Sequence, residues 1–177
     1  MLLTKTTEIA IQCLVLLSRQ PKGTLITPQP ISMTLGSSES YTSKILRTLA
    51  KADLLESHRG ASGGFSLARD PKDITLLEVV EACEGSIIGN HCREFPNPGK
   101  VKRTCGFHQA MVEFQEGVKA ILRKWSIEDL AAKPLSDPED APDCKLRRIL
   151  DAEGNLPKRG TGEALLGQEA IGSLKKS

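Results

Sequence analysis

The feature that most constrains the fold is a glycine-rich run from His58 to Gly64, set between two short segments that have the character of strands. Residues 54–57 form the first segment. The second, Phe65-Ser66-Leu67, alternates apolar and polar residues as a half-buried strand does. Glycines within the run allow the chain to reverse direction sharply. The sequence therefore predicts a β-hairpin with a tight, glycine-rich tip.

Three helices are predicted before the hairpin, over residues 4–19, 31–35 and 38–52. The first has apolar residues at helical spacing over a wide face. Prolines at positions 28 and 30 are expected to confine the second to a few residues, and Gly36 to end it. A serine at position 37 or 38 is expected to cap the third.

The third helix is predicted to be amphipathic, at 100° per residue. Its apolar face carries Ile45, Leu46 and Leu49, and the opposite stripe carries Ser40, Lys44, Arg47 and Lys51. A solvated surface is the ordinary explanation of such a stripe. Two helices followed by a hairpin are, however, the order of a winged helix-turn-helix, in which the second helix of the pair enters the major groove of DNA. Arg59 in the hairpin tip could then reach phosphate or a narrow minor groove.

A long helix is predicted to begin at Phe107, after a short helix that ends near Cys83 and a polar loop over residues 90–106. Apolar residues recur along it in steps of 4, 3, 4, 3 and 4, which is a heptad seam. The seam consists of Phe107, Met111, Phe114, Val118, Ile121 and Trp125. Packing into the protein's own core and packing across a two-fold dimer axis both explain it, and the dimer is the favoured interpretation.

The fold class expected is mainly α with a small β-hairpin wing: a winged helix-turn-helix with a long C-terminal dimerisation helix. We divide the chain into a winged DNA-binding domain (1–85), a cysteine-bearing cofactor loop (86–106), a dimerisation helix with its following segment (107–133) and a mobile tail (134–177).

Composition excludes several other classes of protein. With 24 Lys and Arg against 22 Asp and Glu, the net charge is only +2, so binding to nucleic acid must come from where the charges lie. Aromatic residues are 3%, which argues against a base-stacking single-strand binder. We find no apolar run of membrane length and no signal peptide, and we expect a cytoplasmic protein. Catalytic patterns such as H-E-x-x-H are absent, so an enzyme is not expected.

Two cysteines and a histidine stand beside the long helix in the pattern C-x12-C-x2-H: Cys92, Cys105 and His108, with His91 next to the first. Thiolates favour iron–sulfur clusters, zinc or copper(I), and imidazole suits all three. Two unrelated thiols and a surface histidine are the plain alternative. Cys13 lies on an apolar helix face and is expected in the core.

Four segments resemble the IscR/NsrR (Rrf-two) family of bacterial winged-helix regulators. The start, with Leu3-Thr4 and Glu8, is similar to the family's M-x-L-T opening and acidic eighth position. Ser40-Tyr41 resembles its recognition-helix pair. The run from Arg59 to Leu67 resembles its wing, and the stretch from Ile74 to Gly85 its next helix.

The resemblance implies a homodimer joined by the long helix and bound to double-stranded DNA at a palindromic operator. It implies major-groove contacts from Ser40, Tyr41, Lys44 and Arg47, and wing contacts from Arg59, Ser62, Gly63 and Gly64. The function implied is that of a transcriptional repressor whose operator binding is controlled by an iron–sulfur cluster that senses redox state, nitric oxide or iron.

Cluster-bearing members of the family use three cysteines, with a histidine or an acidic residue of the partner's first helix as fourth ligand. The middle cysteine is missing here, where Phe95-Pro96-Asn97-Pro98 stands, which disfavours a 4Fe-4S cluster and leaves a 2Fe-2S cluster. The leading ligand set is Cys92, Cys105, His108 and Glu8 of the partner subunit, with His91 in reserve. The alternative is a cluster-free regulator of the same fold, controlled by zinc, thiol oxidation or a partner protein. A winged helix that only docks proteins is a third hypothesis.

Overall fold

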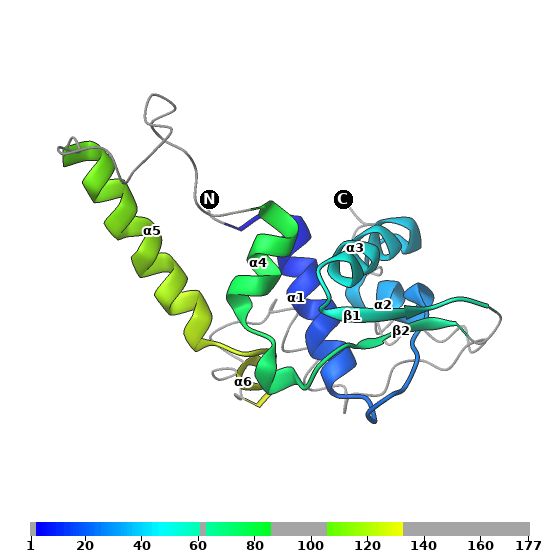
Figure 1. The fold of residues 1–177 in the computed structure, drawn as a ribbon. Helices are drawn as coiled ribbons and strands as arrows, with labels where there is room; N and C mark the ends of the chain where they lie inside the picture. Colours follow the sequence, from blue (N-terminus) through cyan, green and yellow to red (C-terminus); the bar gives the residue numbers. More distant parts are fainter. Residues whose placement is uncertain (1–2, 61–62, 86–105, 133–177) are drawn as a thin grey trace, which may run out of the picture.

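A computed structural model of the protein describes residues 3–60, 63–85 and 106–132. Helices surround one central helix, and a two-stranded hairpin leaves the body on one side (Figure 1). The elements in chain order are α1 (Lys5–Ser18), α2 (Pro28–Leu35), α3 (Glu39–Lys51), β1 (Leu55–His58), β2 (Gly64–Leu67), the 3-10 turn η1 (Pro71–Asp73), α4 (Leu76–Glu84), α5 (Gly106–Lys124) and α6 (Ile127–Ala132). The predicted tail from residue 134 lies outside the described residues, as does the predicted loop over residues 90–106 except Gly106, which begins α5.

The core is built around α1, which is buried along nearly its whole length because helices pack against several of its sides. Ala10, Cys13, Leu14 and Val15 are completely shielded from solvent. The prediction that Cys13 lies in the core is confirmed, and this burial raises the pKa of its thiol to about 12.

The second helix is longer than the sequence analysis predicted. It begins at Pro28 rather than near Ile31, because proline is well tolerated in the first turn, where backbone N–H groups have no partner inside the helix. Its end is as predicted: Gly36 adopts the left-handed conformation, with φ of 61°. This glycine starts the short turn that delivers the chain to α3.

The third helix is capped by Ser38, one of the two serines that the sequence predicted for this role. The side chain of Ser38 accepts a hydrogen bond from the backbone N–H of Tyr41 at 3.3 Å, and so caps α3. Ile45, Leu46 and Leu49 are buried against the body. Burial of this face fixes which side of α3 remains in solvent.

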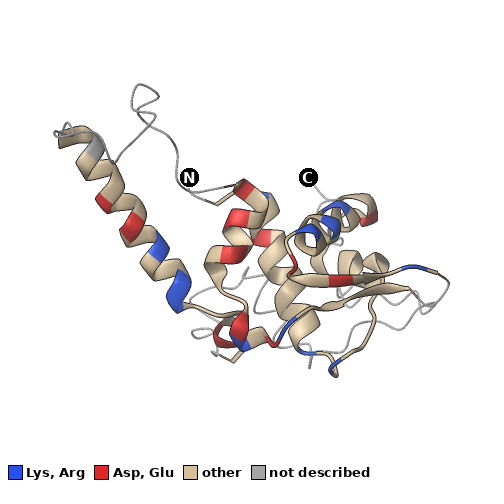
Figure 2. Ribbon diagram, in the orientation of Figure 1, with Lys and Arg blue, Asp and Glu red and all other residues tan. Residues whose placement is uncertain are grey.

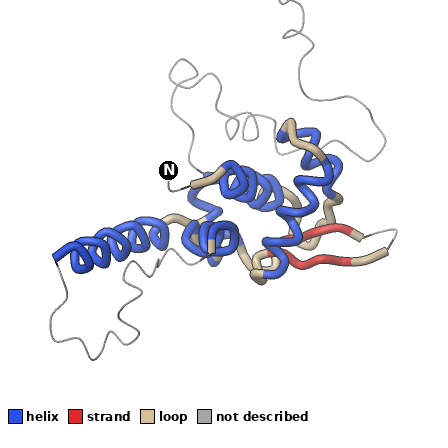
Figure 3. The backbone as a smooth tube through the Cα atoms, turned by 90° about the horizontal axis from the view of Figure 1, so that it is seen from above, coloured by secondary structure: helices blue, strands red, loops and turns tan. Residues whose placement is uncertain are grey.

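The predicted hairpin is present, with its strands antiparallel and Leu55 opposite Leu67. Ile26, in the connection before α2, pairs with Phe65 through two backbone hydrogen bonds of 2.9 and 3.0 Å. The strand β2 is therefore attached to the helical body close to the tip end of the hairpin, one pair before His58 and Gly64. Figures 1 and 3 show the hairpin and α5 leaving the body on opposite sides.

The end of the described chain returns to the core. The backbone N–H of Leu76 donates to the Trp125 carbonyl at 2.8 Å, and that of Ile127 donates to the Ile74 carbonyl at 2.9 Å. Ile127 is fully buried in the same cluster as the side chains of α1. The division of the chain into four parts stays a prediction. It assigned α6 to the dimerisation helix and its following segment (107–133), but α6 packs on the core of the winged domain (1–85).

The fifth helix touches the body only along part of its length. Leu122 packs with Leu77 and Val80 of α4 in a second, smaller cluster, and Val118 is half-buried beside them. No helix within the described residues is both long enough and apolar enough to cross a membrane.

Truncating Ile127 to alanine is expected to lower the free energy of unfolding by about 2–5 kcal/mol, because it removes a fully buried side chain from the core. Chemical denaturation followed by circular dichroism measures the loss. Leu25→Ala is the matched control, since that side chain is 36% exposed. Equal losses for the two variants would mean that α6 does not pack on the core.

Candidate nucleic-acid interface

The exposed side of α3 carries the cationic stripe that the sequence analysis predicted. Ser40, Lys44, Arg47 and Lys51 are all exposed. No ion pair within the described residues neutralises Lys44, Arg47 or Lys51. Figure 2 shows these cations along α3 and several acidic residues along α4. A chain of nearly balanced charge thus presents one distinctly positive helix face.

Tyr41 packs against the body of the protein, whereas Ser40 and Lys44 on the same helix are exposed. Its ring is half-buried against the core, and its hydroxyl lies 2.9 Å from Thr6 Oγ1 on α1. The hydroxyl therefore faces the body of the domain rather than the exposed stripe. A DNA contact from Tyr41 remains a prediction, whereas its contact with α1 is a property of the fold.

The backbone conformation and close packing of the hairpin tip require its glycines. Gly60 has φ of 108°, in the region that favours glycine. A Cβ on Gly63 would meet the His58 carbonyl oxygen at 2.3 Å, and one on Gly64 would meet the Ile26 backbone at 2.9 Å. These two glycines permit the tight turn and the attachment to Ile26. Their predicted role in approaching DNA stays a prediction.

Arg59 is exposed at the start of the tip, and Ser62 lies outside the described residues. The hairpin tip therefore offers one described cation in addition to the stripe on α3.

Most of the predicted metal ligands lie outside the described residues. This holds for His91, Cys92, Cys105 and the side chain of His108, whose backbone belongs to the first turn of α5. Within the described part of the chain, no group of three or more potential ligands is brought together.

Glu8 is the predicted ligand that the structure describes. It is exposed in the first turn of α1, paired with Lys5 at 2.6 Å, and it accepts a hydrogen bond from Gln12 Nε2 at 3.3 Å. Both members of the ion pair are about half exposed, so the pair holds Glu8 only weakly.

A polar cluster that sequence reasoning missed joins the end of α4 to the start of α1. Glu84 Oε1 accepts from the backbone N–H of Thr4 at 3.0 Å, from the Thr4 hydroxyl at 2.6 Å and from the Thr7 hydroxyl. Donation by the Thr4 hydroxyl, supported by Thr7, holds the pKa of Glu84 below its ordinary value. The sequence held one hint: a carboxylate at the end of a helix is unfavourable with respect to the helix dipole unless something else holds it.

The apolar seam of α5 is partly uncovered. Phe107 is 63% exposed, Phe114 54% and Ile121 62%, while Met111, Val118 and Trp125 are half-buried. Packing into the protein's own core therefore accounts for only part of the seam within the described residues. Large apolar side chains in a row on one exposed helix indicate a surface that another protein chain covers.

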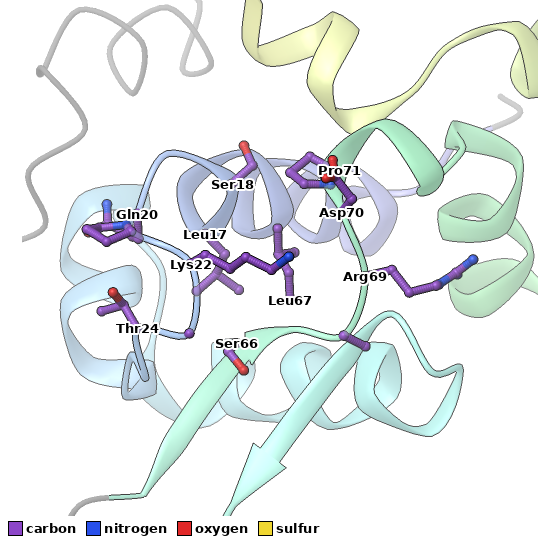
Figure 4. A pocket seen from close by; sticks show the side chains of 13 residues that line it. Leu17, Ser18, Gln20, Lys22, Thr24, Ser66, Leu67, Arg69, Asp70 and Pro71 are labelled. Atoms are coloured by element: carbon purple, nitrogen blue, oxygen red, sulfur yellow. The ribbon is translucent and has the colours of Figure 1, made fainter.

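A cavity of about 310 Å³ lies between the C-terminal end of α1, the following turn and the base of β2 (Figure 4). Its polar groups are largely engaged within the chain. Ser18 Oγ donates to the Val15 carbonyl at 2.8 Å, and Arg69 points away from the cavity and bonds to Glu78 at 2.8 Å. The exposed side chain of Lys22 extends from the turn after α1 toward Leu67. We do not count this cavity as part of the interface.

Comparison with known proteins gives one consistent result. Residues 3–133 match a family described as "Rrf2: Iron-dependent Transcriptional regulator". The putative transcriptional regulator YwgB of Bacillus subtilis is 46% identical over 78 residues, which cover 44% of this chain and half of that relative. The transcriptional regulator NsrR of B. subtilis is 28% identical over 131 residues, 73% of this chain and 90% of NsrR.

A solved structure agrees. CymR of B. subtilis, whose structure is described as that of the global cysteine regulator, superimposes with a TM-score of 0.59 at 25% identity. The superposition covers 73% of this chain and 95% of CymR.

Proposed function

Because the chain belongs to the Rrf2 family of transcriptional regulators, we propose that it represses transcription as a homodimer bound to a palindromic operator, and that an iron–sulfur cluster controls its affinity. Its named relatives are transcriptional regulators and not enzymes, as the sequence analysis predicted. The observation that carries the proposal is the cationic, unpaired face of α3 beside the extended hairpin.

The α3 helix, which we call the recognition helix, has the properties that the major groove requires. The groove is wide enough for one α-helix, and its walls are rows of phosphates. Ser40, Lys44 and Arg47 lie on the exposed side of α3, where lysine and arginine would bind phosphates or base edges. Arg59 on the hairpin would bind the neighbouring backbone or minor groove.

The dimer rests on the exposed part of the α5 seam. Phe107, Phe114 and Ile121 recur at seven-residue spacing, and a second copy of α5 would cover them around a two-fold axis. Two recognition helices related by that axis suit half-sites about 34 Å apart. A palindromic operator follows from this symmetry.

The predicted donors fit a 2Fe-2S cluster in their chemistry. Cys92 and Cys105 would supply thiolates, His108 an imidazole nitrogen, and Glu8 of the partner subunit a carboxylate. The described state of Glu8 supports this, because it is exposed and only weakly paired. When bound, such a cluster supplies reactivity toward oxidants and nitric oxide.

Glu8 belongs to the first turn of α1, so a bond to it would join the cysteines of one protomer to the winged domain of the other. That bond would fix the angle between the two winged domains. A switch from mostly bound to mostly free requires a difference of about 5 kcal/mol between the two states. No cysteine stands between Cys92 and Cys105, where cluster-bearing members of the family have their middle one. This favours a second candidate function, in which zinc or thiol oxidation at the same residues controls the same dimer.

Lys44→Ala and Arg47→Ala are each expected to weaken operator binding about 10-fold and to reduce the salt dependence by about one phosphate contact. The operator duplex is recovered by selection from random DNA, and affinity is measured across a range of salt concentrations. Lys72→Ala, which removes an exposed cation from η1, is the control and should change little. If all three variants behave alike, or if binding does not depend on salt, α3 is not the recognition helix.

Phe114→Ser is expected to convert the dimer into monomers with unchanged helix content, because the side chain is exposed in the single chain. Sedimentation velocity measures the change, and operator affinity should fall with it. Val112→Ser is the control, since Val112 is also exposed but lies off the seam. Dimers that persist in Phe114→Ser would exclude the seam as the interface.

Anaerobically purified protein is expected to contain iron and sulfide, to absorb visible light, and to bind the operator with an affinity that changes on exposure to air. Cys92→Ala and Cys105→Ala should lose the iron, and Cys144→Ala, which changes a cysteine in the predicted tail, should keep it. Zinc without iron would support the second candidate. A metal-free protein with equal affinity in both conditions contradicts any metal-based control.

A further inference from the structure

The first turn of α1 makes polar contacts on two sides, with the end of α4 and with the start of α3. We propose that Thr6 and Glu84 are positioning residues for DNA recognition: they tie the recognition helix, through Tyr41 and the first turn of α1, to the C-terminal end of α4. This inference rests on the proposed function, because it assigns a role in DNA reading to residues that do not face DNA.

The contact with α4 is strong for a surface interaction. One carboxylate oxygen of Glu84 accepts three hydrogen bonds, from the backbone N–H and hydroxyl of Thr4 and from the hydroxyl of Thr7. Hydrogen bonds to an ionised acceptor are stronger than those between neutral groups. The side chain of Thr4, the residue at the N-cap position, does not cap α1 itself. Glu84 therefore supplies the negative charge that the positive end of α1 favours.

The contact with α3 is made by Thr6, which stands between Thr4 and Thr7 in the sequence. Thr6 Oγ1 and Tyr41 Oη are 2.9 Å apart, and the pair is partly buried. Tyr41 belongs to the first turn of α3, directly after the predicted DNA contact Ser40. In helix-turn-helix proteins the N-terminal residues of the recognition helix contact base edges. The Thr6–Tyr41 bond therefore acts at the end of α3 where a small displacement matters most.

The three helices are thus linked by short contacts at adjacent ends. Glu84 is followed by Gly85, after which the chain runs toward Cys92. A displacement at the end of α4 would pull on the first turn of α1 and, through Thr6, on the start of α3. The rest of α1 is packed on nearly all sides, whereas Lys5 and Glu8 in its first turn are exposed, so this turn is the part of α1 that can shift most easily.

The first experiment separates positioning from direct contact with DNA. Tyr41→Phe, Thr6→Val and the double variant are compared for binding to the selected operator and to an unrelated duplex, in the full-length protein. Each single variant is expected to weaken operator binding by about 3- to 10-fold, because each removes the same hydrogen bond. The double variant should be no weaker than either single one, and Thr6→Ser should restore affinity. Affinity for the unrelated duplex and the melting temperature should stay nearly unchanged.

Two outcomes overturn the inference. If Tyr41→Phe weakens binding and Thr6→Val does not, the tyrosine hydroxyl contacts DNA directly. If both variants weaken binding to the two duplexes equally and lower the melting temperature, the bond serves stability alone.

The second experiment tests the α4 end of the link without DNA. Glu84→Gln is compared with Glu81→Gln, which removes the same charge from the same helix, at a carboxylate that bonds to no group within the described residues. Hydrogen exchange should become about 10-fold faster in Glu84→Gln only, at the first hydrogen-bonded amides of both helices, those of Glu8 in α1 and Thr42 in α3. Unchanged exchange at the start of α3 would overturn the link. This result does not depend on operator binding, so a failure of the proposed function is distinguishable from a failure of this inference.

Discussion

Burial of α1 is the constraint on which the rest of the structure depends. Helices cover it on several sides, so the side chains from Ile9 to Leu17 are buried, apart from Ile11, which is half-buried. A small domain gains most of its stability from such a shared apolar centre. Each surrounding helix must turn its own apolar face toward α1, and that requirement decides which faces remain in water.

The recognition surface follows from this requirement. When Ile45, Leu46 and Leu49 of α3 turn inward, Lys44 and Arg47 must turn outward. The hairpin is fixed to Ile26 through Phe65 in β2, so its tip extends from the same body. Although charge is nearly balanced over the whole sequence, the fold places cations along the exposed side of α3 and several carboxylates along α4 (Figure 2). The fold itself generates the positive face.

Sequence reasoning succeeded where the information is local. The period of Ile45, Leu46 and Leu49 and the glycines near position 63 predicted α3 and the hairpin. It failed to place the start of α2, because prolines were taken as barriers rather than as residues suited to a first turn. The contacts of Glu84 with Thr4 and Thr7 were missed for a different reason. They join residues almost eighty positions apart, and no periodic pattern carries that information.

The return of α6 to the core has a mechanical consequence. Backbone hydrogen bonds anchor the chain at residues 74–76 and 125–127, directly after the last turn of α5. The nineteen residues of α5 extend about 28 Å from the residues anchored in this way. The helix therefore acts as a lever anchored on the winged domain, and a tilt of about 5° at the anchored end moves the far end by about 2 Å.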